Sequence, residues 1–216
     1  MATDEDTARC QRGDARENRE RILTAAGHAF AEDGLSVSLI EIARRAGVGN
    51  ATLHRNFTKE QLLDELYADW FARRQAVAEQ ALADPDPWHG LASFLEDVVT
   101  DGTRNRAVGP LFAIRSEWRD RFRCLIKALL TRAQDSGAAR RDLAPEDITL
   151  CLLGVARTMA ITGESSPDQW RRHLTILLDG MKSQHPDRLP GLALSPDQLD
   201  LDLCQWSSQV LRNSST

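Results

Sequence analysis

Hydrophobic residues recur every three or four positions along almost the whole of this 216-residue chain, which is the spacing of amphipathic α-helices. Residues 17–33 place one such stripe on a helix, and Gly34 follows where a helix C-cap is expected. A further helix begins after Ser38, which forms a capping-box pattern with Glu41 three residues later. No segment shows a convincing strand pattern, so the periodicity predicts an all-α fold.

A very short helix is predicted between two longer ones in the stretch EIARRAGVGNATLHRNFTKEQLL, residues 41–63. Gly47 ends the preceding helix, and the capping pattern Thr58–Gln61 begins a helix that extends to about residue 82. Leu53 and Phe57 are spaced to point inward and pin the short helix to its neighbours. Three helices with a tight glycine-containing turn form a helix-turn-helix, whose second helix enters the major groove of DNA.

A sharp break at the sequence Asp-Pro-Asp-Pro, residues 84–87, separates this N-terminal part from a second helical region. The short link between the helices predicted at 145–161 and 168–183 makes them antiparallel neighbours. We therefore predict three parts: a helix-turn-helix DNA-binding domain at 15–75 with its motif at 38–57, a C-terminal helical domain for ligand binding and dimerisation at 84–185, and a tail at 186–216. We expect the tail to be at most partly ordered, with one short helix around 198–211.

The net charge of −5 excludes a protein that is basic all over, but nucleic-acid binding needs only a local patch. The window from Ile42 to Lys59 contains four basic residues and no acidic residue. It therefore suits a DNA backbone, and a solvated surface is the alternative. We find no apolar run of the roughly 18 residues that cross a membrane, and the polar N-terminus is not a signal peptide, so we expect a cytoplasmic protein without a membrane partner.

Catalytic and metal-binding signatures are missing from the sequence. The five histidines show no HExxH or other metal-ligand spacing, and the four cysteines lie far apart, as expected for reduced thiols. There is no glycine-rich phosphate loop and no Gly-X-Ser-X-Gly elbow. We therefore expect no enzyme activity, no cofactor and no metal site.

Residues 15 to about 75 resemble the DNA-binding domain of the TetR/AcrR family of bacterial transcriptional regulators. The resemblance lies in RERILTAAGHAFAEDGLSVSLIEIARRAGVGNATLHRNF and TKEQLL, which match in order over some fifty residues. It implies that Ser38 caps a helix and binds phosphate, and that Thr52 and Lys59 contact DNA. The chain departs from the family at His54, where tyrosine is usual, and at Gly49, where serine or a similar cap is usual.

Side-chain chemistry extends this set of DNA contacts. Asparagine pairs with adenine, and alanine or threonine touches the methyl group of thymine, whereas basic side chains bind phosphates. For Arg44 the alternative is an intramolecular or solvated position. The predicted DNA-binding residues are Ser38, Arg44, Asn50, Ala51, Thr52, His54, Arg55 and Lys59.

In the TetR/AcrR family the C-terminal helices form a dimer and enclose a ligand pocket, so the resemblance implies both features here. The large and polar residues that would line a pocket are Phe94, Phe112, Arg115, Trp118, Phe122 and Met159. The apolar residues that would form a dimer interface are Leu152, Val155, Trp170, Leu174, Leu177 and Met181. Ordinary core packing is the alternative for both sets.

We therefore expect a ligand-responsive DNA-binding transcriptional regulator whose partners are a double-stranded DNA operator, a small-molecule effector and a second copy of the chain. As a repressor it would bind a near-palindromic operator as a homodimer and be released by a small apolar or amphipathic effector. An activator is an alternative, because the sign depends on where the operator lies relative to the promoter. Gly49 and His54 keep open a helical small-molecule-binding protein with degenerate DNA-binding function.

Overall fold

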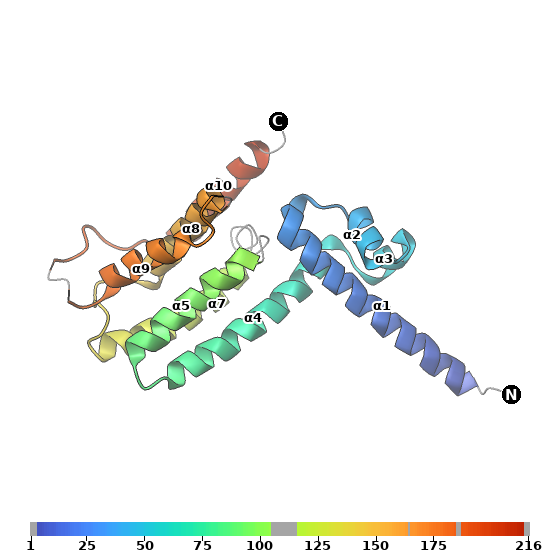
Figure 1. Cartoon of the computed structure of the whole chain (residues 1–216), viewed down its shortest axis with the longest axis horizontal. Helices are drawn as coiled ribbons and strands as arrows, with labels where there is room; N and C mark the ends of the chain where they lie inside the picture. The colour runs from blue at the N-terminus through green and yellow to red at the C-terminus, as the bar shows by residue number, and fades with distance from the viewer. Residues whose placement is uncertain (1–3, 105–115, 164, 185–186, 214–216) are drawn as a thin grey trace. The chain divides into compact units, whose positions relative to one another are not determined.

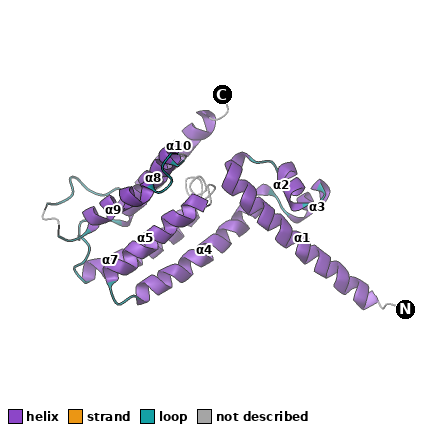
Figure 2. Ribbon diagram, viewed as in Figure 1, coloured by secondary structure: helices purple, strands orange, loops and turns teal. Residues whose placement is uncertain are grey.

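The computed structural model describes residues 4–104, 116–163, 165–184 and 187–213. Within these ranges the chain is helical, and the strand-like pairing found there is a single bridge between Ala139 and Lys182 (Figure 2). This confirms the predicted all-α fold. The chain divides into two compact units, the first ending at Trp70 and the second beginning at Phe71.

The first unit is built around a helix-turn-helix (Figure 1). Its elements are α1 (Asp4–Asp33), the 3₁₀ turn η1 (Gly34–Ser36), α2 (Leu39–Ala46), α3 (Asn50–Asn56) and the first part of α4 (Lys59–Ala83). The helix α1 begins well before the predicted residue 17. The buried apolar side chains that hold these elements together are Ile22, Ala26, Ala29, Phe30, Ile42, Ala43, Ala46, Leu53, Phe57, Leu62, Leu63, Tyr67 and Trp70.

Side-chain caps fix where α2 and α4 begin. The Ser38 hydroxyl accepts a hydrogen bond from the Glu41 amide at 3.2 Å, as the sequence predicts. At α4 the predicted capping box is complete, because the Gln61 amide donates to the Thr58 hydroxyl at 3.2 Å and the Gln61 side chain accepts from the Thr58 amide at 2.8 Å. Such caps satisfy backbone donors that the helix itself leaves open.

In the residues that the structure describes, the second unit contains the remainder of α4 and the helices that follow it (Figure 1). These are α5 (Pro87–Arg104), α7 (Ser116–Asp135), α8 (Pro145–Thr162), α9 (Gln169–Met181) and α10 (Pro196–Asn213). The helices α5, α7 and α8 pack against one another, and α9 packs along α8. Their buried core includes Leu91, Phe94, Leu95, Val99, Trp118, Phe122, Ile126, Leu129, Ile148 and Val155.

A buried arginine joins α4 to α5 inside the second unit. Arg74 is only 5% exposed, and its guanidinium group binds both the carboxylate and the main-chain oxygen of Asp97. The carboxylate of Asp101, one turn further along α5, lies 3.8 Å from the same guanidinium group. A buried cation held by two carboxylates in this way fixes α4 against α5.

The segment after Pro186 is more extensively folded than the predicted partly ordered tail. It contains the 18-residue helix α10, whose Leu199 and Leu203 are buried against the rest of the unit. Asp200, between these leucines, forms ion pairs with Arg119 and Arg123 of α7. The helix itself was predicted at about 198–211, close to its observed bounds, whereas the burial of Leu199 and Leu203 was not predicted because it depends on contacts distant in sequence.

Candidate functional site

The helix α3 presents a polar surface because two large apolar side chains hold its other face. Leu53 is 0% exposed and Phe57 is 2% exposed, which confirms their predicted inward positions. The guanidinium group of Arg19 lies 4.3 Å from the centre of the Phe57 ring and covers it. The predicted DNA-binding residues on α3 are then exposed or, for Thr52, half-buried: Asn50, Ala51, Thr52, His54 and Arg55.

The start of α3 is bare of side-chain caps. Gly49 is its N-cap residue, and the Gly49 carbonyl accepts hydrogen bonds from the amides of Thr52 at 2.9 Å and Leu53 at 3.1 Å. Glycine has no side chain that could accept hydrogen bonds from the remaining amides of the first turn, so those amides are left at the positive end of the helix. Backbone amides in that position suit the phosphate groups of DNA.

The turn between α2 and α3 depends on a close contact that we did not predict. Gly47 has a left-handed backbone with φ +64°, and the amide of Val48 returns to the Ala43 carbonyl at 3.1 Å. The Arg21 side chain donates to the carbonyls of Ala46 at 2.7 Å and Gly47 at 3.1 Å. A cation is favourable at the negative end of a helix, so an arginine on α1 was a candidate cap for α2.

The basic window of the sequence is partly neutralised in the structure. Arg44 binds both carboxylate oxygens of Glu41, at 2.7 and 2.8 Å. Arg45 binds Glu41 at 2.8 Å, Glu32 at 2.8 Å and Asp33 at 2.6 Å. The hydrogen bonds from Arg44 and Arg45 lower the pKa of Glu41 to about 2. Although residues 42–59 contain no acidic residue, the carboxylates of Glu32, Asp33 and Glu41, which lie outside this window, pair with its arginines in the folded chain.

Two predicted phosphate contacts are engaged within the protein. The Lys59 ammonium group donates to the carbonyls of Leu35 at 2.5 Å and Val37 at 2.9 Å. An ammonium group has three donors, so at most one remains for a phosphate. The Ser38 oxygen accepts from the Glu41 amide, which leaves its own hydroxyl hydrogen to donate. Lys59 therefore holds the loop before α2 in place, whatever it contributes to DNA binding.

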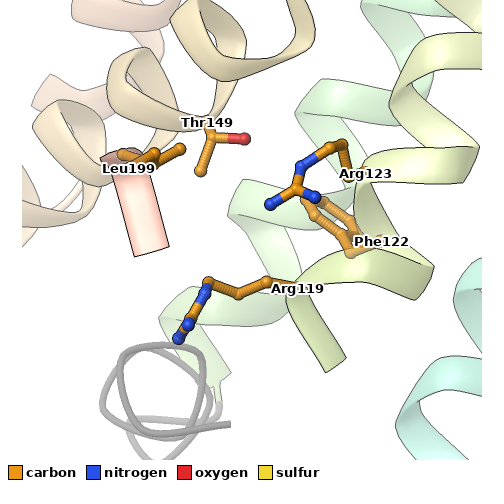
Figure 3. A pocket seen from close by; sticks show the side chains of 5 residues that line it. All are labelled: Arg119, Phe122, Arg123, Thr149 and Leu199. Atoms are coloured by element: carbon orange, nitrogen blue, oxygen red, sulfur yellow. The ribbon is translucent and has the colours of Figure 1, made fainter. Parts of the chain in front are cut away.

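The second unit contains a small recess between α7, α8 and α10 (Figure 3). It is shallow, with a volume of about 10 Å³ for a water-sized molecule, which is room for roughly one water. Figure 3 shows the side chains that line it: Arg119, Phe122 and Arg123 from α7, Thr149 from α8 and Leu199 from α10. The recess thus combines two cations with apolar walls.

The recess matches the predicted pocket at one residue, Phe122. Phe94 packs against Phe122, with ring centres 6.0 Å apart, and is itself fully buried, while Trp118 is 6% exposed. Met159 does not line the recess and packs instead against an apolar cluster from α5, α8 and α9. Phe112 and Arg115 lie outside the described residues. Aromatic content located the helices of the recess but did not identify its two arginines.

Ion pairs fill the charged side of the recess. The Asp200 carboxylate accepts from Arg119 at 2.7 Å and from Arg123 at 3.3 Å. Arg123 also pairs with Glu146 at 3.2 Å and with Asp120 at 2.7 Å. Two of these side chains are almost fully buried, Arg119 at 3% and Glu146 at 7% exposed. Buried charges need such partners, since desolvation of an isolated ion is costly.

The predicted dimer residues lie mainly inside the chain. Four of the six form or adjoin the core of the second unit and are at most 4% exposed: Val155, Trp170, Leu174 and Met181. Leu152 and Leu177 are partly buried against the same cluster. The periodicity identified the inward stripe of α8 and α9, so a second copy cannot cover those four side chains. The outward stripe instead carries three large apolar side chains: Leu150, Ile161 and Ile176, which are 42%, 69% and 61% exposed.

Other candidate chemistry is sparse in the described part of the chain. No group of three metal-ligating side chains occurs there, and no helix there is long and apolar enough to cross a membrane. Cys124, Cys151 and Cys204 have free thiols, and burial raises the pKa of Cys151.

Comparison with known proteins assigns both units. Residues 22–66 match the family model described as bacterial regulatory proteins, tetR family, and residues 86–183 match the one described as transcriptional regulator SbtR-like, C-terminal domain. A TetR transcription regulatory protein from Mycobacterium vanbaalenii is similar at 30% identity and a TM-score of 0.52, over 80% of this chain and 99% of that chain. A TetR transcriptional regulator from Streptomyces coelicolor is similar at 31% identity and a TM-score of 0.56, over 77% of this chain and 99% of that chain.

The same fold occurs in SmeT, the repressor of the Stenotrophomonas maltophilia multidrug efflux pump SmeDEF. That similarity has 21% identity and a TM-score of 0.57, over 80% of this chain and 97% of SmeT. The helix α10 lies beyond the last residue of the matched C-terminal model.

Proposed function

Since this chain belongs to the TetR family of bacterial transcriptional regulators, we propose that it is a repressor that binds a near-palindromic operator as a homodimer and leaves it when a small molecule binds. Membership of this family makes the chain a DNA-binding regulator and not an enzyme. The repressor, dimer and effector parts of the proposal are supported by the features below.

The observation that carries the proposal is the exposed polar face of α3. Its side chains differ in what they recognise in the major groove. Asn50 can pair with adenine through its amide, while Ala51 and Thr52 can contact the methyl group of thymine. His54 and Arg55, further along the same exposed surface, are suited to phosphates. A helix of only seven residues is marginal alone, but Leu53 and Phe57 supply the burial that holds it.

The proposed dimer uses the outward stripe of α8 and α9. Leu150, Ile161 and Ile176 leave large apolar side chains on these helices without a cover from their own chain. Exposed apolar patches on a folded protein mark surfaces for interaction. A two-fold dimer would present two α3 helices to major grooves about 34–36 Å apart, and hence read a palindrome.

The proposed response to an effector follows from thermodynamic linkage. A small apolar or amphipathic molecule that binds one dimer state better than the other shifts the population between them. A coupling of about 1–3 kcal/mol would lower operator affinity about 5- to 150-fold.

Selection from a random duplex library at two salt concentrations tests the DNA-binding proposal. We expect an enriched near-palindrome whose affinity falls steeply as salt rises. Asn50→Ala should relax one position in each half-site, with a loss of about 1–3 kcal/mol against the preferred base. Gln75→Ala, an exposed polar change on α4 outside the motif, should leave the enriched sequence unchanged. Absence of enrichment, also after unfolding and refolding to remove bound ligand, would contradict the proposal.

Replacement of one apolar side chain by a charge tests the dimer. Ile161→Asp should convert the dimer to a monomer in light scattering after gel filtration, because burying an unpaired carboxylate is costly. Leu192→Asp is the matched control, since Leu192 is 99% exposed and lies outside α8 and α9. A dimer that survives Ile161→Asp as well as Leu192→Asp would place the interface elsewhere.

A further inference from the structure

A polar contact joins α8 to α9 beside their outward apolar stripe. The Thr158 Oγ1 atom of α8 lies 2.6 Å from the Nδ1 atom of His173 on α9. Thr158 stands about one turn before the exposed Ile161, and His173 about one turn before the exposed Ile176. Residues three apart are neighbours on a helix surface, so this contact borders the surface that we propose for the dimer.

The hydrogen bonds of Thr158 determine how the His173 ring is held. The Thr158 hydroxyl donates to the Gly154 carbonyl, one turn earlier on α8, at 3.2 Å. A hydroxyl has a single hydrogen, so its oxygen accepts the second hydrogen bond from the Nδ1–H of His173. A neutral imidazole with its hydrogen on Nδ1 gains a further proton on Nε2 and still donates from Nδ1. The ring therefore keeps its place when it is protonated, and only its charge changes.

The His173 ring lies over a glycine in the groove between the two helices. The nearest atom that a Cβ at Gly154 would meet is Cε1 of His173, at 3.9 Å. Both residues are half-buried in the single chain. A second copy seated on Ile161 and Ile176 would bury the ring further, and burial disfavours the charged form of a histidine.

The charged residues next to this contact are cations. Arg157 adjoins Thr158 on α8, Arg172 adjoins His173 on α9, and both arginines are exposed. A proton on His173 thus adds a third positive charge to this part of the surface. Carboxylates on the helices around it are bound to cations elsewhere: Glu96 to Arg171, Asp97 and Asp101 to Arg74, Asp120 and Glu146 to Arg123, and Asp179 to Lys182.

We propose that the dimer formed through α8 and α9 is a proton sensor, in which His173 is neutral in the paired state and its protonation in acid separates the two copies. This inference rests on the proposed function, because it adds a form of regulation to the dimer proposed above. The sign follows from linkage. The contribution of the neutral ring to dimer stability is complete above the usual titration range of histidine and is lost as the pH falls through it.

Two copies of the histidine make the response steep. The neutral fraction of an unperturbed histidine falls about ten-fold between about pH 7.5 and about pH 5.5. Because both copies must be neutral, the dissociation constant of the dimer should rise by up to about 100-fold over this interval. A regulator that reads a palindrome as a dimer would then lose operator affinity in acid at low protein concentration.

Sedimentation equilibrium of the full chain at about pH 7.5 and about pH 5.5 measures this dissociation constant. His173→Asn keeps a hydrogen-bonding amide for Thr158 but does not take up a proton, so its dissociation constant should be nearly independent of pH. His89→Asn is the matched control, because His89 is an exposed histidine of α5 that pairs with Asp84 and lies outside α8 and α9. It should retain the wild-type response to pH.

Equal pH dependence in the wild type and in His173→Asn would overturn the inference. If His173→Asn forms no dimer at neutral pH, His173→Gln supplies a second neutral side chain, and the absence of a dimer in both would overturn the inference as well, because the shape of the ring would then matter and not its charge. Ile161→Asp keeps the two proposals apart. A monomeric Ile161→Asp together with a wild-type dimer that ignores pH would refute the proton sensor alone, whereas a wild-type chain that is monomeric at both pH values would refute the proposed dimer and the sensor with it.

Discussion

The turn between α2 and α3 makes a quantitative prediction about the helix-turn-helix. Replacing Gly47 by alanine has two costs. Its left-handed backbone, φ +64°, disfavours any side chain by about 1–2 kcal/mol. A Cβ atom there would also lie 2.7 Å from the Arg21 Nη2 atom, so the guanidinium group would have to withdraw.

The withdrawal would break the hydrogen bonds from Arg21 to the carbonyls of Ala46 and Gly47. Because Arg21 is exposed, we assign this loss about 1 kcal/mol, somewhat below the range of about 1.5–3 kcal/mol for hydrogen bonds of charged groups. Gly47→Ala should therefore lower the free energy of unfolding by about 2–3 kcal/mol in total, as the sum of about 1–2 for the backbone and about 1 for the cap.

Gly34→Ala is the matched control for the backbone cost. Gly34 has φ +73°, and a Cβ atom there would meet nothing within 4 Å. It should therefore lose about 1–2 kcal/mol, the backbone penalty alone. Both changes restrict the unfolded chain equally, so that contribution cancels in the comparison.

Urea denaturation followed by far-ultraviolet circular dichroism measures both losses, and a double-mutant cycle isolates the contact. In an Arg21→Met background, Gly47→Ala should cost no more than Gly34→Ala. Equal losses for the two glycines in the wild-type background would refute the reasoning. An excess loss at Gly47 that persists without Arg21 would refute it as well.

Three further predictions concern other contacts. Glu41→Gln should lower the melting temperature of the protein at neutral pH, because hydrogen bonds from arginines lower the pKa of Glu41 in the folded protein from 4.5 to about 2. The difference in melting temperature between wild type and variant should be complete above about pH 4.5 and disappear as the pH falls to about 2. A difference in melting temperature that is independent of pH would contradict this. Lys59→Met should lower the melting temperature, because the carbonyls of Leu35 and Val37 lose their hydrogen-bond donor. The slope of operator affinity against salt concentration should decrease by no more than the equivalent of about one phosphate contact. A larger decrease in this slope would show that Lys59 acts chiefly as a DNA contact. Leu199→Ala should cost about 2–4 kcal/mol in urea denaturation, because its side chain is 2% exposed, and a loss below about 0.5 kcal/mol would show that α10 is not part of the folded core.

Local patterns in the sequence were sufficient to predict the helices of the helix-turn-helix motif. Hydrophobic spacing placed Leu53 and Phe57 inward, and the capping pattern located the start of α4 at Thr58 and Gln61. These features depend on residues within one or two turns of each other, so their physics is visible in the order of the amino acids.

Contacts between distant segments were not visible in the same way. Lys59 was assigned to phosphate, yet it binds carbonyls more than twenty residues earlier. On α8 and α9 the periodicity found an apolar stripe, but it could not say that Val155 and Trp170 face their own core while Ile161 and Ile176 face outward. An apolar side chain is buried equally well by its own chain or by a second copy, so sequence alone does not separate the two.

The ion pair between α4 and α5 restricts how the second unit can change shape. If α4 slid along α5 by one turn, about 5.4 Å, in the direction away from Asp101, the buried Arg74 guanidinium group would leave both carboxylates, which is strongly unfavourable. In the opposite direction Asp101, one turn further along α5, could take the place of Asp97. The ion pair therefore makes sliding of this helix pair directional, because α4 has a second bound position one turn away on one side only.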